Sequence, residues 1–362
     1  MALSEIFKTQ VITVDAAHPD PGAIEEAARI LRRGRLVAFP TETVYGLGAN
    51  ALDSMAVSTI FVAKQRPSSN PLIVHTFSAD EAQALAAQWP PEAEALAAAF
   101  WPGPLSIVVP RSKRIPDIVS AGKPTVALRV PSNPVALALL RAARVPVAAP
   151  SANRSEKISP TTAEHVLHTL AGRIPAVVDG GPASGGIEST VVAITADGPM
   201  ILRPGLISPA EIEAVIGPVR RSDGTHSEEV SDLATPGFSL RHYAPQTPLI
   251  LVAAANVEKK LAQLFSKLST EAKLGYITLS EETKLGYIGY RTLPDFEDSV
   301  LVQMLPDSPQ GYAEQLYATL HTMDAAKVHR IVAEMPPDDD EWLAIRDRLG
   351  RASQYGLKDT QS

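Results

Sequence analysis

The sequence predicts an α/β protein of two domains, in which a mixed sheet with helices precedes a small, doubly wound α/β domain. Strand-like apolar runs alternate with helix-like segments along most of the 362 residues, more than one typical hydrophobic core accommodates. A polar stretch without periodicity, residues 217–246, separates two alternating parts. Hydrophobic residues make up 45% of the chain, which is ample for burial in both parts.

The first part is predicted to begin with a helix over 23–33, because Pro21 and Gly22 precede it and Gly34 follows it. The alanine-rich pattern over 79–100 is helical but interrupted at Trp89-Pro90-Pro91. Further helices are expected at 57–64, 134–143, 162–170 and 209–216, and strands at 36–39, 72–74, 105–109, 126–129, 145–149, 177–178, 190–194 and 200–202. Alternating and hairpin-like spacings together favour a mixed sheet.

The second part repeats the alternation on a smaller scale. Its strands are expected at 249–253, 275–279 and 330–334, and its helices at 257–268, 312–325 and 341–349. The predicted organisation is therefore a first domain over 1–218, a linker or lid over 219–247 and a small C-terminal domain over 248–362. The pentapeptide KLGYI occurs at 273–277 and again at 284–288, which we interpret as a local duplication.

Composition and charge exclude several classes of protein. A net charge of −7 and only 5% aromatic residues argue against a mainly electrostatic nucleic-acid binder or membrane-surface binder. The absence of cysteine excludes disulfides, thiolate metal sites and cysteine nucleophiles, and is typical of a reducing compartment. The N-terminal MALSEIFKTQ lacks the pattern of a signal peptide, and no run of about 18 apolar residues occurs. We therefore expect a cytoplasmic protein without membrane segments.

The stretch FPTETVYGLGANA at 39–51 contains the spacing G-x-G-x-x-A, with Gly46, Gly48 and Ala51. A dinucleotide-binding loop needs an acidic residue about 20 positions further on, where this chain has RPSSN at 66–70. A dehydrogenase is thus disfavoured, and we expect the glycines to allow a tight turn beside a ligand site. Motifs for a P-loop, a nucleophile elbow and an H-E-x-x-H zinc site are also absent from the sequence.

Short polar segments follow many of the predicted strands and helices. These segments are Thr41–Thr43, Lys64–Pro67, His75, Arg129, Ser151–Asn153, Gly185–Thr190 and Arg203–Gly205. Each segment alone has a simple structural explanation, such as a helix C-terminus, a turn, a histidine with its hydrogen bonds satisfied or a surface ion pair. Together they combine guanidinium groups, an amine, hydroxyls and a glycine-rich loop, which suits a polyanionic ligand such as a nucleotide.

Eight ordered motifs between about residue 10 and the linker resemble the threonylcarbamoyl-AMP synthase family, which carries a YrdC-type domain. They are FPTETVYGLGANA, KQRPSSNPLIVH, WPGPLSIVV, TVALRVPSNP, VAAPSANRSEKISPTTAEHV, STVV, ILRPG and SLRHYAPQTP. The linker and the end of the chain resemble the long, two-domain form of the family. This resemblance implies a YrdC-like open twisted mixed sheet, with a concave basic surface, followed by a small Rossmann-like C-terminal domain.

The resemblance also implies a reaction, in which L-threonine, bicarbonate and ATP give threonylcarbamoyl-AMP and pyrophosphate. The enzyme would be a nucleotidyltransferase that uses Mg²⁺ with ATP. A downstream threonylcarbamoyl-transferase complex would move the product to adenosine 37 of tRNA, which this chain would contact only indirectly or weakly. The chemistry needs no protein nucleophile, because the carbamate of threonine itself attacks the α-phosphorus, so catalysis rests on positioning and electrostatics.

The resemblance assigns site residues position by position. It places threonine-binding residues at Thr43, His75, Arg129, Ser151 and Ser189, where the arginine would clamp the substrate carboxylate in a fork. It places ATP-binding residues at Lys64, Arg66, Asn70, Thr125, Asn153, Ser159, Arg203 and His242. Lys64 and Arg66 would supply the catalytic charge, and no protein-held metal is implied. Arg241, His242 and Tyr243 would belong to the lid, although TPGFSLRHYAP differs mildly from its relatives, which usually begin with Ser and carry Met after the glycine.

Two other functions remain open at this point. A nucleic-acid-binding module without catalysis would use the concave basic surface for RNA, against which the charge and sparse aromatics argue. A related carbamoyl-transfer enzyme would carry zinc-finger and acylphosphatase-like segments, which this sequence lacks.

Overall fold

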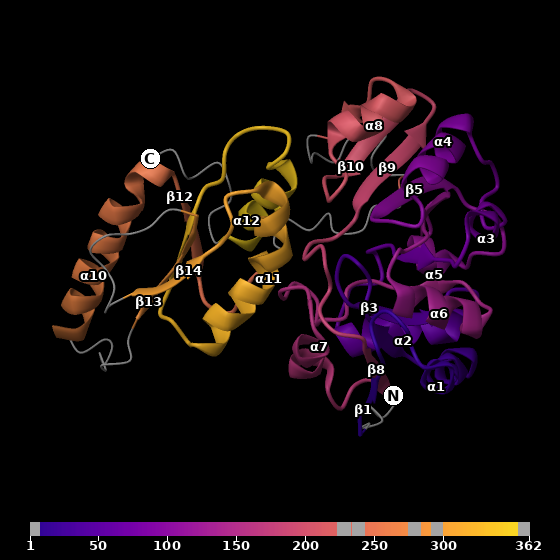
Figure 1. Ribbon diagram of the computed structural model, residues 1–362, viewed down its shortest axis with the longest axis horizontal. Helices are drawn as coiled ribbons and strands as arrows, with labels where there is room; N and C mark the ends of the chain where they lie inside the picture. The colour runs from indigo at the N-terminus through magenta and orange to yellow at the C-terminus, as the bar shows by residue number, and fades with distance from the viewer. Residues whose placement is uncertain (1–7, 223–232, 234–242, 274–283, 291–299, 354–362) are drawn as a thin grey trace. The chain divides into compact units, whose positions relative to one another are not determined.

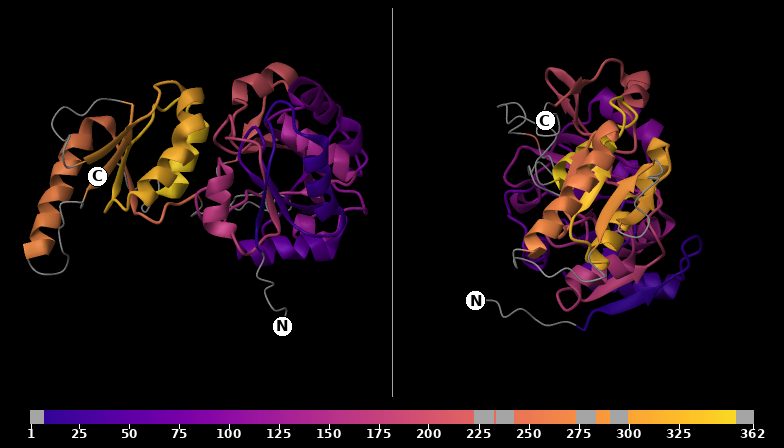
Figure 2. Two further views of the ribbon diagram at one scale, coloured as in Figure 1. Left: turned by 60° about the horizontal axis from the view of Figure 1, so that its bottom comes forward. Right: turned by 90° about the vertical axis from the view of Figure 1, so that its left-hand side faces the viewer.

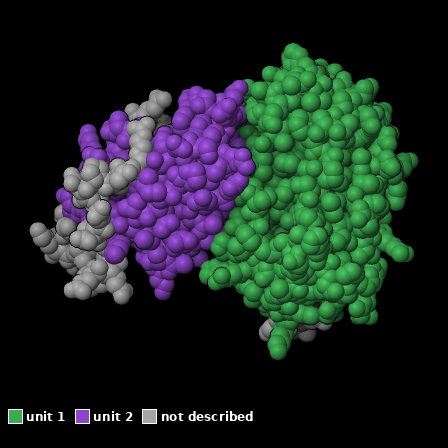
Figure 3. All heavy atoms as spheres, viewed as in Figure 1, with its two compact units in different colours: residues 1–155, 159–239 green, residues 156–158, 240–362 purple. Residues whose placement is uncertain are grey.

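The computed structural model describes residues 8–222, 233, 243–273, 284–290 and 300–353 (Figure 1). The chain forms two compact units, of which unit 1 contains residues 1–155 and 159–239 and unit 2 contains residues 156–158 and 240–362 (Figure 3). The division after residue 239 falls inside the segment predicted as a linker. Among the residues that the structure describes, no helix is both long enough and apolar enough to cross a membrane.

Unit 1 combines helices with one large sheet. Its helices are α1 (Pro21–Arg32), α2 (Ser54–Lys64), α3 (Ala79–Gln83), α4 (Pro91–Phe100), α5 (Asp117–Ser120), α6 (Pro134–Ala143), α7 (Ala163–Leu170) and α8 (Pro209–Ile216). Its strands are β1 (Gln10–Thr13), β2 (Val37–Phe39), β3 (Gly46–Asn50), β4 (Ile73–His75), β5 (Leu105–Pro110), β6 (Thr125–Arg129), β7 (Val147–Ala148), β8 (Ala176–Asp179), β9 (Thr190–Thr195), β10 (Gly198–Arg203) and β11 (Arg220–Arg221).

Among the described residues, these strands form one 11-stranded sheet in the order β1-β8-β2-β3-β7-β4-β6-β5-β9-β10-β11. Parallel pairs such as β4 with β6 and β5 with β9 alternate with antiparallel pairs such as β5 with β6. The mixed sheet predicted from the sequence is confirmed.

The two faces of this sheet are covered differently. One face buries residues such as Val74, Leu128 and Val192 against helices α2, α3, α4, α5, α7 and α8. On the other face, α1 and α6 cover only the part near β1, β8, β2 and β7. The rest of that second face carries a smaller apolar cluster, which includes Ile73 and Ala127 and on which Leu233 packs. Because side chains alternate along a strand, this less covered face is where His75 and Arg129 also lie.

The glycines of the FPTETVYGLGANA stretch lie in a strand, so the expected tight turn is wrong. Gly46 and Gly48 belong to β3, which pairs antiparallel with β2. A Cβ atom on Gly48 would lie 2.8 Å from both Phe39 Cε1 and Val147 Cγ1. Glycine is therefore required here because neighbouring side chains lie directly over the backbone, a role that glycine often has inside strands.

Helix boundaries follow capping residues where these are present. Helix α2 begins at Ser54, three residues before its predicted start, because the Asp53 carboxylate accepts the N–H groups of Met55 and Ala56. Helices α6 and α8 have the predicted limits, and both carry a side-chain cap and a proline at their start.

Unit 2 is a smaller α/β unit with four described strands, β12 (Leu249–Val252), β13 (Leu285–Gly289), β14 (Val300–Met304) and β15 (Ile331–Glu334). They form a parallel sheet in the order β12-β15-β13-β14. Figures 1 and 2 show α10 (Val257–Lys273) on one face and α11 (Pro309–Ala325) and α12 (Leu343–Ala352) on the other. A short 3₁₀ helix, η1 (Ala254–Asn256), precedes α10. The doubly wound prediction is confirmed.

Two strands of unit 2, β13 and β14, were not predicted from the sequence. The predicted strand 275–279 lies outside the described residues, and the second copy of KLGYI supplies β13. Residues 156–158 also belong to unit 2, although they lie between two parts of unit 1 in the sequence. Lys157 forms a parallel bridge with Ala244, whose N–H donates to Glu156 O at 3.0 Å.

Candidate functional site

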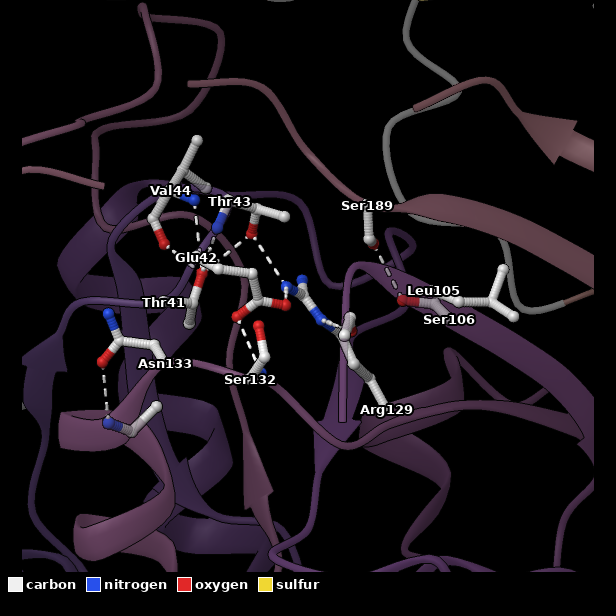
Figure 4. Close-up of polar contacts among 12 residues, drawn as sticks. Thr41, Glu42, Thr43, Val44, Leu105, Ser106, Arg129, Ser132, Asn133 and Ser189 are labelled. Atoms are coloured by element: carbon white, nitrogen blue, oxygen red, sulfur yellow. Dashed lines mark hydrogen bonds and ion pairs between the residues drawn. The ribbon is translucent and has the colours of Figure 1, made fainter. Parts of the chain in front are cut away.

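A buried arginine forms the centre of the candidate threonine side (Figure 4). Arg129 ends β6 and is 3% exposed. Its Nη2 donates to Glu42 Oε1 at 2.5 Å and to Thr43 Oγ1 at 3.1 Å, and its Nε donates to Gly103 O at 3.3 Å. Nη1 has no hydrogen-bond partner among the described residues. The guanidinium is thus held firmly on one side and keeps a donor on the other.

The hydroxyl of Thr43 has a defined direction. Thr41 Oγ1 donates its hydrogen to Val44 O at 2.7 Å, so in the 2.8 Å contact between the two threonine hydroxyls Thr43 must be the donor. Since Thr43 Oγ1 also accepts from Arg129, it has only acceptor capacity left for a ligand.

His75 lies beside this cluster, at the end of β4 and opposite Arg129 in the parallel pair. It is buried, its ring meets Phe39 edge-on, and its Nδ1 has no hydrogen-bond partner among the described residues. Burial, together with the nearby Arg129 charge, lowers the pKa of His75 to about 3. The imidazole is therefore neutral at physiological pH.

This lowered pKa predicts a pH dependence of stability. In the unfolded chain His75 titrates near its ordinary value of 6.5, so protonation favours unfolding as the pH falls from 6.5 towards 3. Between pH 7.5 and pH 5, we expect the wild type to lose about 2 kcal/mol more free energy of unfolding than His75→Gln. Urea unfolding at the two pH values measures this difference, and equal losses would contradict the buried neutral imidazole.

A second cluster joins the end of α2 to the segment after β7. Lys64 is 1% exposed, and its Nζ donates to the backbone oxygens of Ser151 and Asn153, each at 2.5 Å. Asn153 Oδ1 lies 3.4 Å from the same Nζ and accepts from Ser151 Oγ at 2.6 Å. Burial, with Arg66 nearby, holds the pKa of Lys64 well below its ordinary range.

Three other nucleotide candidates are Arg66 and Asn70, which follow α2, and Thr125, at the start of β6. Arg66 is buried and its Nη2 donates to Pro71 O at 3.2 Å, while Asn70 donates its backbone N–H to Pro67 O. Thr125 begins β6, four residues before Arg129 and therefore about 13 Å away along the strand. The structure does not join Thr125 to the Arg129 cluster.

The third cluster surrounds the start of β9. Arg203 donates to the backbone oxygen and the hydroxyl of Ser189, at 3.0 Å and 3.1 Å, and the Ser189 hydroxyl also contacts Ser106 Oγ at 2.9 Å. Ser159 Oγ donates to Glu188 Oε1 at 2.6 Å. All of these side chains come from motifs that the sequence singled out, although Ser106 and Glu188 were given no role there.

Of the three residues predicted for the lid, the structure describes only Tyr243. Arg241 and His242 lie outside the described residues. Tyr243 is buried within unit 2, where it stacks on Tyr317 with ring centroids 5.8 Å apart. Within the linker, Leu233 packs on the apolar cluster of the sheet face that carries Arg129, and its backbone oxygen accepts from Lys123 Nζ at 2.8 Å.

Three residues that the structure places in these clusters, Glu42, Ser106 and Glu188, were given no role from the sequence. Glu42 stands between two predicted polar positions but was given no role, although a carboxylate beside two threonines in a loop rich in polar groups was a usable signal. Ser106 alternates with apolar residues in LSIVV, and its position on the same face as Arg129 follows from strand periodicity once the strand is placed.

Comparisons with known proteins cover both units. The family model described as "Telomere recombination" matches residues 29–205, and the model described as "Threonylcarbamoyl-AMP synthase, C-terminal domain" matches residues 207–354. The chain is 42% identical over 336 residues to the threonylcarbamoyl-AMP synthase of Pyrococcus abyssi, covering 92% of this chain and 95% of the relative. It is 40% identical over 344 residues to that of Bacillus subtilis, covering 94% and 96%.

A solved structure is similar over both units as well. The crystal structure of P. abyssi Sua5 complexed with L-threonine matches with a TM-score of 0.85 and 41% identity, covering 96% of this chain and 98% of that chain. The fold class expected from the motifs, an open mixed sheet followed by a small parallel α/β unit, is thereby confirmed.

Proposed function

We infer that this chain, which belongs to the threonylcarbamoyl-AMP synthase family, forms L-threonylcarbamoyladenylate from L-threonine, bicarbonate and ATP and releases pyrophosphate. The observation that carries the inference is the Arg129 cluster, in which a buried guanidinium keeps Nη1 for an anion beside an acceptor-only Thr43 hydroxyl. An α-amino acid presents an anionic carboxylate next to N–H donors, so its two groups match these two neighbours.

The reaction has two bond-forming steps. The amine of threonine adds to carbon dioxide, derived from bicarbonate, and loses a proton to give a carbamate. A carbamate oxygen then attacks the α-phosphorus of ATP, and the bond to pyrophosphate breaks. We propose that Lys64, Arg66 and Arg203 stabilise the phosphate charge in this nucleotidyl transfer, which is supported by their burial on polar segments of the same unit.

An approaching nucleotide would change the state of Lys64. Burial lowers the pKa of Lys64, whereas a nearby polyanion raises the pKa of an amine. We propose that ATP binding raises the pKa of Lys64 and so favours the ammonium where the reaction needs positive charge.

Mg²⁺ would be held mainly by ATP. The described residues contain no group of three His, Cys, Asp or Glu side chains placed to hold a metal ion. Mg²⁺ commonly keeps several waters and binds substrate phosphates with few protein ligands. The cationic side chains would therefore face the ATP phosphates, and Mg²⁺ would enter the site bound to ATP. When bound, Mg²⁺ would neutralise charge on the phosphates.

The product would then leave for a separate reaction. We propose that a downstream threonylcarbamoyl-transferase complex passes the group to adenosine 37 of tRNA, and that the chain works in the cytoplasm. The family membership supports the downstream step.

The proposed function predicts threonine-dependent release of pyrophosphate. The purified protein is incubated with ATP, Mg²⁺ and bicarbonate, with L-threonine, with D-threonine or with neither, and pyrophosphate is measured. We expect release only in the mixture with L-threonine, because D-threonine with its amine and carboxylate on the Arg129 cluster directs its side chain differently. Equal release in all three mixtures, or no release, would overturn the assignment.

A further inference from the structure

We propose that Glu42 is a positioning residue for threonine, which holds Arg129 so that Nη1 is the part of the guanidinium presented to the substrate carboxylate. The inference rests on the proposed function, because it assumes that threonine binds at this cluster.

Glu42 connects two segments through its side chain (Figure 4). Oε1 accepts from Arg129 Nη2 at 2.5 Å, and Oε2 accepts from the backbone N–H of Ser132 at 3.1 Å. The Glu42 side chain is only 11% exposed. Its carboxylate therefore fixes the guanidinium against the backbone that follows β6, three residues further along the chain.

The backbone of Glu42 is fixed as well. Its carbonyl oxygen accepts from the N–H of Gly185 at 2.7 Å and from Ser184 Oγ at 3.4 Å. A Cβ atom on Gly185 would lie 2.9 Å from this carbonyl oxygen and 2.3 Å from Leu206 Cδ1. Only glycine at position 185 allows the glycine-rich loop to approach Glu42 this closely. The backbone that carries the Glu42 carboxylate is therefore fixed in place.

This arrangement leaves the guanidinium one direction for a ligand. Nη2 already donates to Glu42 and Thr43, and Nε donates to Gly103 O. The two-pronged fork expected for Arg129 is therefore partly occupied within the protein. A substrate carboxylate would meet Nη1, while the Thr43 hydroxyl, oriented by the same Nη2, accepts from the neighbouring amine.

Two opposite effects make the role testable. As a nearby anion, Glu42 repels the substrate carboxylate, so removing its charge alone would tighten threonine binding. As a positioning group, Glu42 holds Arg129 Nη1 and the Thr43 hydroxyl where the substrate carboxylate and amine bind, so disturbing Glu42 would weaken threonine binding. We infer that positioning dominates, because Arg129 is buried and Glu42 supplies its only ion pair among the described residues. Without Glu42, the planar guanidinium would be held only by longer hydrogen bonds to the Thr43 hydroxyl and Gly103 O, at 3.1 Å and 3.3 Å.

The test compares Glu42→Gln and Glu42→Asp with the wild type. Gln keeps the length and loses the charge, whereas Asp keeps the charge but is too short to reach Arg129 and Ser132 together. We expect both variants to raise the KM for L-threonine about tenfold or more, with little change in the KM for ATP. The variant Glu81→Gln is the matched control, because Glu81 also accepts a backbone N–H, from Phe77, and lies outside the site.

An unchanged or lower KM for threonine in either variant overturns the proposal, since charge repulsion or a purely structural role would then explain Glu42. Calorimetric titration of L-threonine without ATP provides a second readout, in which the dissociation constant should rise to a similar extent. If the wild type binds threonine but releases no pyrophosphate, the proposed function fails while this titration still tests Glu42. If one variant does not fold, the other carries the test.

Discussion

Replacing Lys64 with alanine is expected to lower threonine-dependent pyrophosphate release by about a hundredfold or more, and replacing Arg66 with alanine should have a similar effect. Both side chains are buried. Arg66 is cationic, ATP binding would favour the ammonium of Lys64, and phosphoryl-type transfer relies on positive charge held at the reacting oxygens. Lys64 has an additional structural task, because its Nζ holds the backbone oxygens of Ser151 and Asn153.

The measurement therefore needs a control for folding. Far-ultraviolet circular dichroism and the melting temperature should show that both variants remain folded, and Lys113→Ala, at an exposed lysine, should keep wild-type turnover. Near-normal turnover in both Lys64→Ala and Arg66→Ala would show that the assignment of these residues to the phosphates is wrong.

Replacing Gly205 with alanine is expected to cost about 3 kcal/mol or more of the free energy of unfolding of unit 1. A Cβ atom there would lie 2.2 Å from the backbone N of Thr190 and 2.5 Å from the carbonyl carbon of Ser189. Backbone atoms cannot rotate away as a side chain does, so either β9 or the segment after β10 must shift. Such a shift would also displace the Ser189 hydroxyl from Arg203.

Thermal unfolding measures this effect, which corresponds to a fall of roughly 6–12 °C for a unit of this size. Gly22→Ala is the matched control, since its nearest contact is the Asp20 carboxylate at 3.2 Å and it lies in helix α1. We expect less than about 1 kcal/mol of change in the control. Equal melting temperatures for Gly205→Ala and the wild type would show that the chain around Ser189 accommodates the methyl group.

The elements with local start and stop signals were predictable from the sequence. Helices α6 and α8 have strong caps and prolines at their first turn, and their predicted limits match the structure. Strand β3 was not predictable in the same way, because Gly46 and Gly48 weaken any strand pattern. The close approach of Phe39 and Val147 that requires glycine at position 48 arises only in the folded sheet. Strand β13 was not predicted, since only the first copy of the repeated KLGYI was assigned to a strand, and that copy lies outside the described residues.

The candidate site was predictable as a set of residue types, but its connections were not. Motifs identified Arg129, Thr43 and Ser189 without showing that Glu42 occupies part of the guanidinium. That contact joins residues 87 positions apart, and only the packing of the sheet brings them together. The direction of the Thr43 hydroxyl likewise depends on a chain of hydrogen bonds through Thr41 to Val44 O.

The assignment of residues 156–158 to unit 2 has a consequence for truncation experiments. A chain ending at residue 239 would remove Ala244, the bridge partner of Lys157, and would leave this short segment without its strand-like pairing. The segment lies between Asn153 and Ser159, two of the proposed ATP-side residues. Unit 2 is thus discontinuous in sequence. During synthesis on the ribosome, some 85 further residues must be added after the 156–158 segment before its bridge partner Ala244 exists. Any loss of activity on deleting unit 2 therefore reports on this late pairing as well as on the deleted fold.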